Sequence, residues 1–304
     1  MSAEKVLNAG PSGIEVTYER FGDVQAPPVL LIMGIGAQML GWNEGFCDEL
    51  VARGLQAIRF DNRDVGLSSH FPDAPAPDLA AALSGDTSSA SYTLSDMAAD
   101  TIGLLDALGL DSAHIVGASM GGMIAQTIAV EHPDRVRSLT SMMSTTGDRS
   151  VGQPKPKALG ALAGPTPRSR EDVMNRAVAA FRVVGSPGFK LDEDEVRERA
   201  GRSYDRAYDP LGVARQAVAV IASGDRTARL RTVDVPALVI HGADDLMCDV
   251  SGGRATADAI PGAELVVIDG MGHDLPRALW PQIASLIANL VQRVEAASLR
   301  VRPV

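Results

Sequence analysis

Gly117-Ala118-Ser119-Met120-Gly121 is the stretch that decides the fold of this chain. It follows a short apolar run at 113–117 and precedes a helical pattern at 121–131, which Pro133 ends. A serine with glycines at this spacing fits a tight turn from a strand into a helix, because glycine removes the side chains that would collide there. The first amides of such a helix favour negative charge at the serine. The stretch therefore predicts a strand–turn–helix unit that presents Ser119 as a nucleophile.

Outward from this unit, apolar runs of strand length alternate with helical patterns. Residues 28–33 are apolar throughout, which is typical of a strand buried on both faces, and residues 14–21 alternate as a half-exposed strand does. Ser95 is the predicted N-cap of a helix that ends at Leu108. The order predicts an α/β fold with a mostly parallel central sheet and helices on both faces. The further strands are expected at 56–60, 113–117, 138–143, 236–241 and 263–268, and the further helices at 43–53 and 277–297.

The segment 145–232 departs from this alternation. It opens with the loop-forming stretches 152–158 and 164–167, rich in proline and glycine, and continues with helical patterns at 170–183, 192–208 and 211–222. We predict a core domain formed by 1–144 and 233–304, with a helical cap (lid) inserted at 145–232. The alternative is a set of additional packing helices without a gating role.

Five histidines are candidates for the general base that would activate Ser119. His273 is favoured because it directly follows the last predicted strand, at the carboxyl edge where sites of open α/β sheets form. Glycines at 270 and 272 let the backbone bend so that this imidazole points inward. The others are His132 at a helix end, His114 at the opposite sheet edge, His241 as a packing residue, and His70 in a loop that its position leaves open.

Two adjacent carboxylates, Asp244 and Asp245, follow the strand that ends at His241. The chain order serine, acid, histidine brings one of them to the imidazole. Neighbours in a turn face different directions, so we favour Asp245 and keep Asp244 as the alternative. His273 would then take the Ser119 proton and later return it to the leaving group, while Asp245 holds the imidazole in the required tautomer.

The negatively charged intermediate of this chemistry needs preorganised N–H donors. One predicted donor is the backbone N–H of Met120, directly after the serine. The second is expected in the loop 33–36, which follows the first buried strand. We favour the Ile35 N–H, with that of Gly36 as the alternative.

These residues resemble the α/β-hydrolase family over nearly the whole chain, through residues 31–36, 60–68, 117–126, 239–245 and 270–273. Within the family the chain resembles carboxylesterases and lipase-like esterases, including the aclacinomycin methylesterase group, whose members often carry Met-Gly where many relatives have His-Gly. Met33-Gly34 matches that variant. The resemblance implies the catalytic roles of Ser119, Asp245 and His273, two oxyanion amides and a helical cap.

The Asp-x-Arg-x-x-Gly-x-Ser loop of the family falls on four residues that we interpret as structural, bracing the neighbouring loops: Asp61, Arg63, Gly66 and Ser68.

The expected function is a serine carboxylesterase that acts on small to medium, mostly apolar esters through an acyl-enzyme, with no cofactor or metal. Cofactor-free perhydrolases and carbon–carbon bond hydrolases keep the same triad and remain alternatives, as does a ligand-binding protein without catalysis. Dehalogenases and epoxide hydrolases use an aspartate nucleophile, so Ser119 counts against both. An apolar substrate pocket is expected from Met33, Trp42, Met143 and Met247.

Composition excludes other classes. The formal charge of −10 and the sequence pI of about 5.0 argue against a partner made of nucleic acid and against docking to an anionic membrane. Cys47 and Cys248 are expected to be free thiols. The start of the chain lacks a secretory pattern and the apolar runs are too short to span a membrane, so a cytoplasmic protein is predicted. No pattern in the sequence indicates an oligomeric state.

Overall fold

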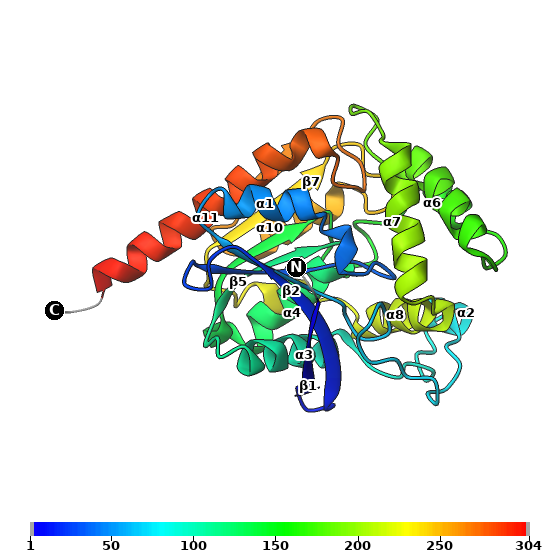
Figure 1. Cartoon of the computed structure of the whole chain (residues 1–304), viewed down its shortest axis with the longest axis horizontal. Coiled ribbons are helices and arrows are strands. Elements are labelled where there is room, and N and C mark those ends of the chain that lie inside the picture. Colours follow the sequence, from blue (N-terminus) through cyan, green and yellow to red (C-terminus); the bar gives the residue numbers. More distant parts are fainter. Residues whose placement is uncertain (1–2, 302–304) are drawn as a thin grey trace.

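The computed structural model describes residues 3–301, in which eight strands form one sheet with helices on both faces (Figure 1). The strand order is β1-β2-β4-β3-β5-β6-β7-β8. The pairs β1–β2 and β2–β4 are antiparallel, and all further pairs are parallel, which confirms the predicted mostly parallel sheet. The strands are β1 (Glu4–Ala9), β2 (Ile14–Phe21), β3 (Pro28–Ile32), β4 (Gln56–Phe60), β5 (Ala113–Ala118), β6 (Val136–Met142), β7 (Ala237–Gly242) and β8 (Glu264–Ile268).

Two apolar clusters, one on each face, attach the helices to the sheet. On one face α3 (Leu94–Ala107), α4 (Met120–Glu131) and α10 (Ser251–Ala259) share a buried cluster with the strands. On the other face α1 (Glu44–Val51) and α11 (Trp280–Val301) do the same. Because β3, β4 and β5 are buried along their full length, their apolar residues serve both clusters.

All elements between β6 and β7 in the described chain are helical. The helices α6, α7 and α8 lie together on one side of the sheet (Figure 1, right) and match the predicted helical patterns within two residues at each end. The short helix α5 lies partly in the stretch expected to be loop, with Pro156 at its first position, where proline costs a helix nothing. The bounds are α5 (Pro156–Leu162), α6 (Arg170–Val184), α7 (Glu193–Arg206), α8 (Pro210–Ser223) and α9 (Thr227–Leu230).

The predicted N-cap of α3 is wrong. The helix begins at Leu94, and Thr93 precedes it. The Asp96 carboxylate accepts the backbone N–H and the hydroxyl of Thr93, each at 2.8 Å. Thr93 has an acid three residues on, which favours it as a cap, whereas the residue three after Ser95 is Ala98.

Cys47 and Cys248 are buried free thiols, as expected. No helix in residues 3–301 has the length and apolar character needed to cross a membrane. The short elements are η1 (Met39–Gly41), α2 (Leu79–Leu83), η2 (Pro133–Arg135) and η3 (Arg277–Leu279).

Candidate active site

Ser119 lies on the turn between β5 and α4 with a positive φ of 56° and a ψ of −122°. Such backbone is strained for a residue with a side chain and persists only where its surroundings fix it. A Cβ on Gly117 would lie 2.0 Å from the Gly121 carbonyl oxygen, and a Cβ on Gly121 would lie 2.1 Å from the Ile32 carbonyl oxygen. Both glycines are therefore sterically required, which confirms the sequence-based prediction of a tight strand-to-helix turn.

Neighbouring backbone holds this turn in place. The Ser119 N–H donates to the Met142 carbonyl at 2.9 Å, at the carboxyl end of β6. The Ser119 carbonyl accepts from the Ser144 hydroxyl at 2.8 Å and from the Gly122 N–H at 2.9 Å. These contacts fix the serine backbone at the carboxyl edge of the sheet.

The structure brings the three predicted catalytic residues into one hydrogen-bonded chain. His273 Nε2 lies 3.1 Å from Ser119 Oγ, and His273 Nδ1 lies 2.7 Å from Asp245 Oδ2. The other oxygen of Asp245 accepts from the amides of Met247 and Cys248, each at 2.8 Å. The acid is therefore anchored on both oxygens, with one of them directed at the imidazole.

The environment of Asp245 favours the charged form of its carboxyl. Burial disfavours its charge, but contacts with His241 and His273 and the Cys248 amide outweigh burial and hold the pKa of this carboxyl below its usual range. His241 Nε2 is 3.5 Å from Asp245 Oδ2 and 2.7 Å from the Cys248 carbonyl oxygen. The sequence indicated His241 only as a packing residue; its contact with the acid, four positions along, becomes visible once the turn is folded.

Asp244 contacts the backbone of the loop that carries His273 rather than its imidazole. Its side chain is exposed, and its Oδ2 accepts the Gly270 N–H at 2.9 Å. Its own N–H donates to the Met271 carbonyl at 3.0 Å. Of the two adjacent carboxylates, Asp245 therefore contacts the histidine, and Asp244 supports the loop that carries it.

The end of α6 and the residues that follow it support the same loop. The His273 N–H donates to the Val184 carbonyl at 2.7 Å, and the Gly272 N–H donates to Ser186 Oγ at 2.9 Å. The Ser186 hydroxyl in turn donates to Asp274. These contacts join the helical segment to the histidine, and sequence analysis missed them because the partners lie almost ninety positions apart.

The loop after β3 passes directly beside the serine. A Cβ on Gly34 would lie 3.0 Å from Ser119 Cβ and 3.4 Å from Ser119 Oγ. Within residues 3–301, the backbone N–H groups of Ile35 and Met120 donate no hydrogen bond. The Gly36 N–H is engaged, because it donates to Gln216 Oε1 at 2.8 Å. The Ile35 and Gly36 N–H groups are the two predicted alternatives for the second oxyanion donor. Of these two, only the Ile35 N–H donates no hydrogen bond within the described part of the chain.

The loop after β4 braces the loop after β3, as expected from the resemblance. Asp61 Oδ1 accepts the Met39 N–H at 2.7 Å, and the Ser68 hydroxyl donates to the Asp61 carbonyl at 2.6 Å. The Asn62 side chain donates to the Met33 carbonyl at 3.0 Å. A Cβ on Gly66 would lie 2.2 Å from Asp61 Oδ2, so a glycine is needed there.

The residues predicted to line a pocket differ in position. Met33, Met143 and Met247 lie in loops that follow the carboxyl ends of β3, β6 and β7, the edge that carries Ser119. Trp42 has no exposed surface, and its ring stacks on Phe46 with centroids 5.5 Å apart. Trp42 is therefore a core residue under α1 rather than a pocket wall.

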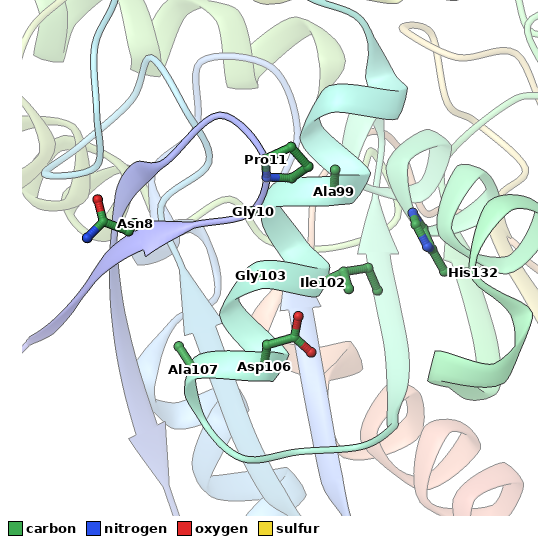
Figure 2. A pocket seen from close by; sticks show the side chains of 9 residues that line it. All are labelled: Asn8, Gly10, Pro11, Ala99, Ile102, Gly103, Asp106, Ala107 and His132. Atoms are coloured by element: carbon green, nitrogen blue, oxygen red, sulfur yellow. The ribbon is translucent and has the colours of Figure 1, made fainter.

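The remaining histidines lie away from the serine. His114 contacts Ser138 and Glu295, and burial lowers its pKa to about 4. His132, at the end of α4, is half-buried rather than exposed and lines a shallow pocket against the β1–β2 turn and α3 (Figure 2). None of Ser119, Asp245 and His273 lines that pocket.

His70 belongs to a charged cluster with Asp64 and Asp209, whose ligand atoms lie within 4.8 Å of one another. Arg215 donates to both oxygens of Asp64 at 2.8 Å and to Asp209 at 3.2 Å. The guanidinium already pairs with both carboxylates, so the cluster has the character of an ion-pair network rather than of a cation site.

The sheet order, with a serine on the turn after β5, defines an α/β hydrolase. The sequence agrees: residues 27–276 match the family described as alpha/beta hydrolase fold, and the chain belongs to this family. The resemblance seen in the motifs is thereby confirmed.

Two curated relatives extend over nearly the whole chain. Rhodomycin D methylesterase DauP from Streptomyces sp. (strain C5) is 30% identical over 296 residues, covering 90% of this chain and 94% of that protein. A 2-hydroxymuconate semialdehyde hydrolase from Pseudomonas sp. (strain CF600) is 29% identical over 284 residues, covering 90% and 89%. The crystal structure of the esterase RhEst1 from Rhodococcus sp. ECU1013 has a TM-score of 0.73 at 20% identity, covering 97% of this chain and 99% of its own, and shares the fold.

Proposed function

We propose that this chain is a serine carboxylesterase that hydrolyses small to medium, mostly apolar carboxylic esters through an acyl-enzyme intermediate. The observation that carries the proposal is the hydrogen-bonded chain from Ser119 through His273 to Asp245, with distances of 3.1 and 2.7 Å. A relative named as a methylesterase, aligned over 90% of this chain, points to the same type of bond.

The first half of the reaction forms the acyl-enzyme. Asp245 accepts the Nδ1–H of His273, which leaves Nε2 free to take the Ser119 proton as Oγ attacks the ester carbonyl. The carbonyl oxygen becomes an oxyanion, and the N–H groups of Ile35 and Met120 stabilise it. Each such donor lowers the barrier by roughly 3 kcal/mol. The intermediate collapses as His273 returns the proton to the departing alcohol.

The second half releases the acid. Water attacks the acyl carbon and passes a proton to His273 Nε2, and the same two amides receive the new oxyanion. The bond between Ser119 Oγ and the acyl carbon then breaks, and His273 returns the proton to the serine. Asp245 stabilises the charged imidazole in both halves.

The helical segment at 145–232 is proposed as a cap over this site, with 1–144 and 233–304 as the core domain. Its helix α7 is fastened to the core, because Arg206 pairs with Asp61 at 2.7 Å and the Gln38 side chain donates to the carbonyls of Ser203 and Ala207. Met33, Met143 and Met247, in the loops after β3, β6 and β7, are proposed to give the bound ester an adaptable apolar surface.

A carbon–carbon bond hydrolase is the second candidate, because the relative named 2-hydroxymuconate semialdehyde hydrolase aligns over 90% of this chain. Both reactions use the same serine chemistry, so the substrate distinguishes them.

The test measures the hydrolysis rates of a panel of p-nitrophenyl and methyl esters on the wild type and on Ser119→Ala. The panel also contains a diketone of the kind formed when an aromatic ring is opened, as the probe for carbon–carbon bond hydrolysis. We expect ester hydrolysis in the wild type, its loss in the variant, and a fluorophosphonate label on the peptide that contains Ser119. An unchanged rate in Ser119→Ala would overturn the proposal. Cleavage of the diketone without ester hydrolysis would establish the second candidate, and a folded wild type that neither reacts nor labels would indicate a binding protein.

A further inference from the structure

Gln216, a buried residue of α8, contacts two core loops with its two polar atoms. Its Oε1 accepts the Gly36 N–H at 2.8 Å, and its Nε2 donates to the Arg63 carbonyl at 2.7 Å. Gly36 belongs to the loop after β3, and Arg63 belongs to the loop after the neighbouring strand β4. One side chain from the proposed cap thus ties the loop beside Ser119 to the neighbouring loop that braces it.

The loop that Gln216 holds is a tight turn. The Ala37 N–H donates to the Gly34 carbonyl at 3.2 Å, and Gly36 has a φ of +68°. A positive φ at the third residue is the mark of a type II turn. The Gly34 carbonyl and the Ile35 N–H belong to one peptide unit, so this turn also sets the direction of the proposed oxyanion donor.

A turn of this type can change its conformation by rotation of its central peptide. Types I and II differ in the dihedrals on either side of the central peptide, with ψ of the second residue changing from about −30° to about +120°. Rotation of the Ile35–Gly36 peptide would interconvert them and would place a carbonyl where the Gly36 N–H now lies. Gln216 Oε1 accepts a hydrogen bond from that N–H and would meet the carbonyl with repulsion, so it favours the present orientation.

We propose that Gln216 is a positioning residue for the oxyanion hole: from the cap, it holds Gly36 and thereby the 34–37 turn, whose first peptide unit carries the Ile35 N–H beside Ser119. This inference rests on the proposed esterase function of the site. It makes the cap part of the catalytic scaffold, because undocking α8 would loosen one of the two oxyanion donors.

The test replaces Gln216 by methionine, which has a similar shape and lacks both hydrogen-bonding groups. Since loss of a whole oxyanion donor costs about 10²- to 10³-fold, loosening one donor is expected to lower kcat about tenfold or more, with KM within about twofold. The matched control is Arg202→Met, which removes the exposed contact of α7 with Glu44 and leaves the loop after β3 untouched. Its kcat is expected to equal that of the wild type.

A second readout separates positioning from general stability. A trifluoromethyl ketone binds through its oxyanion, so its inhibition constant is expected to rise in Gln216→Met by the same factor as kcat/KM falls. The carboxylate product, which forms no oxyanion, is expected to bind both proteins alike. A lower Tm with unchanged kcat and unchanged ketone affinity would overturn the inference and leave the proposed function intact.

A measurement on the wild type covers the case in which the variant does not fold. Amide hydrogen exchange of the peptide spanning 34–38 is expected to show a protected amide at Gly36 and fast exchange at Ile35. Fast exchange at Gly36 would overturn the inference. A wild type without esterase activity and without fluorophosphonate labelling would instead overturn the proposed function.

Discussion

His241 lies against Asp245, with Nε2 3.5 Å from Oδ2 and both side chains fully buried. The same Nε2 is 2.7 Å from the Cys248 carbonyl, and the Cys248 amide donates to the other oxygen of Asp245. His241 therefore holds the turn that carries the acid, whereas His273, at 2.7 Å from the same Oδ2, has the closer contact with the carboxylate. Asp245 therefore contacts two histidines, and His273 is the one that also contacts Ser119.

Asp245 and Asp244 provide a matched pair for testing this arrangement. Asp245→Asn leaves the shape intact but offers an N–H where His273 needs an acceptor, so kcat is expected to fall by about 10³- to 10⁴-fold. Asp244→Asn keeps an acceptor for the Gly270 N–H on an exposed side chain, and its kcat is expected to stay within about twofold of the wild type. Steady-state ester hydrolysis measures both.

Equal loss of activity in the two variants would contradict this assignment of the acid. Circular dichroism and Tm of both variants serve as the control for folding. Because the two residues are adjacent, an effect that depends only on charge near the site would affect both alike.

Sequence patterns were most informative about the fold and the candidate site where the chemistry is local. Three features of the sequence are specific, because few other arrangements need them. They are the glycines around Ser119, the serine–acid–histidine order and the apolar runs of the buried strands. The sequence could favour Asp245 over Asp244 but could not exclude Asp244. The fold sets the directions in which two adjacent side chains of a turn point. Gln216, a partner 180 positions from Gly36, takes up the Gly36 N–H and so favours the Ile35 alternative, which no local pattern could indicate.

Other features were outside the reach of local patterns. The strand β1 is an edge strand with mostly exposed residues, including Glu4 and Lys5, so it lacks an apolar run. Trp42 follows the loop beside Ser119 in sequence, but its packing on Phe46 turns it into the core. Helical periodicity shows which face of the 145–232 segment is apolar, and it does not show which polar residues on it become buried.

Gly121 of the serine turn is expected to tolerate no side chain. A Cβ there would lie 2.1 Å from the Ile32 carbonyl oxygen, a backbone atom that cannot rotate away. We expect Gly121→Ala to lower the free energy of unfolding by about 4 kcal/mol or more, or to abolish soluble expression. Gly160→Ala is the control, since nothing lies within 4 Å of that Cβ position in α5. There, alanine is expected to be neutral or to stabilise by up to about 1 kcal/mol. Urea unfolding measures both, and a Gly121→Ala protein as stable as the wild type would contradict the turn geometry.

Arg206 is expected to anchor the proposed cap through a buried carboxylate. It pairs with Asp61, whose side chain is fully buried, so its removal would leave that charge without its cation. We expect Arg206→Met to lower the free energy of unfolding by about 2 kcal/mol or more. Arg202→Met removes an exposed pair on the same helix and is expected to cost less than about 1 kcal/mol. Similar losses in the two variants, measured by urea unfolding, would argue against a special role for the buried pair.

His70 and Asp209 join the core to the start of α8, and their contact is expected to depend on pH. His70 Nδ1 lies 2.9 Å from Asp209 Oδ2. Burial lowers the pKa of His70, but the Gly66 carbonyl and the Asp209 carboxylate outweigh it and raise the pKa above its usual value. A raised pKa in the folded state means that the stabilisation is fully present below the unfolded value of about 6.5 and is lost as the pH rises through the folded value.

The pKa of Asp209 is shifted downward: burial raises it, and the Gly212 amide and His70 outweigh that effect. Its stabilisation is therefore present above the unfolded value of about 3.9 and is lost at more acidic pH. Together the two shifts predict that the contact contributes most between about pH 4 and pH 6.5. We expect the difference in Tm between the wild type and His70→Gln to be larger at pH 6 than at pH 8.5, because glutamine carries no charge to lose. Thermal unfolding at both values measures it, and a difference in Tm that is independent of pH would show that His70 acts only as a neutral hydrogen-bonding group.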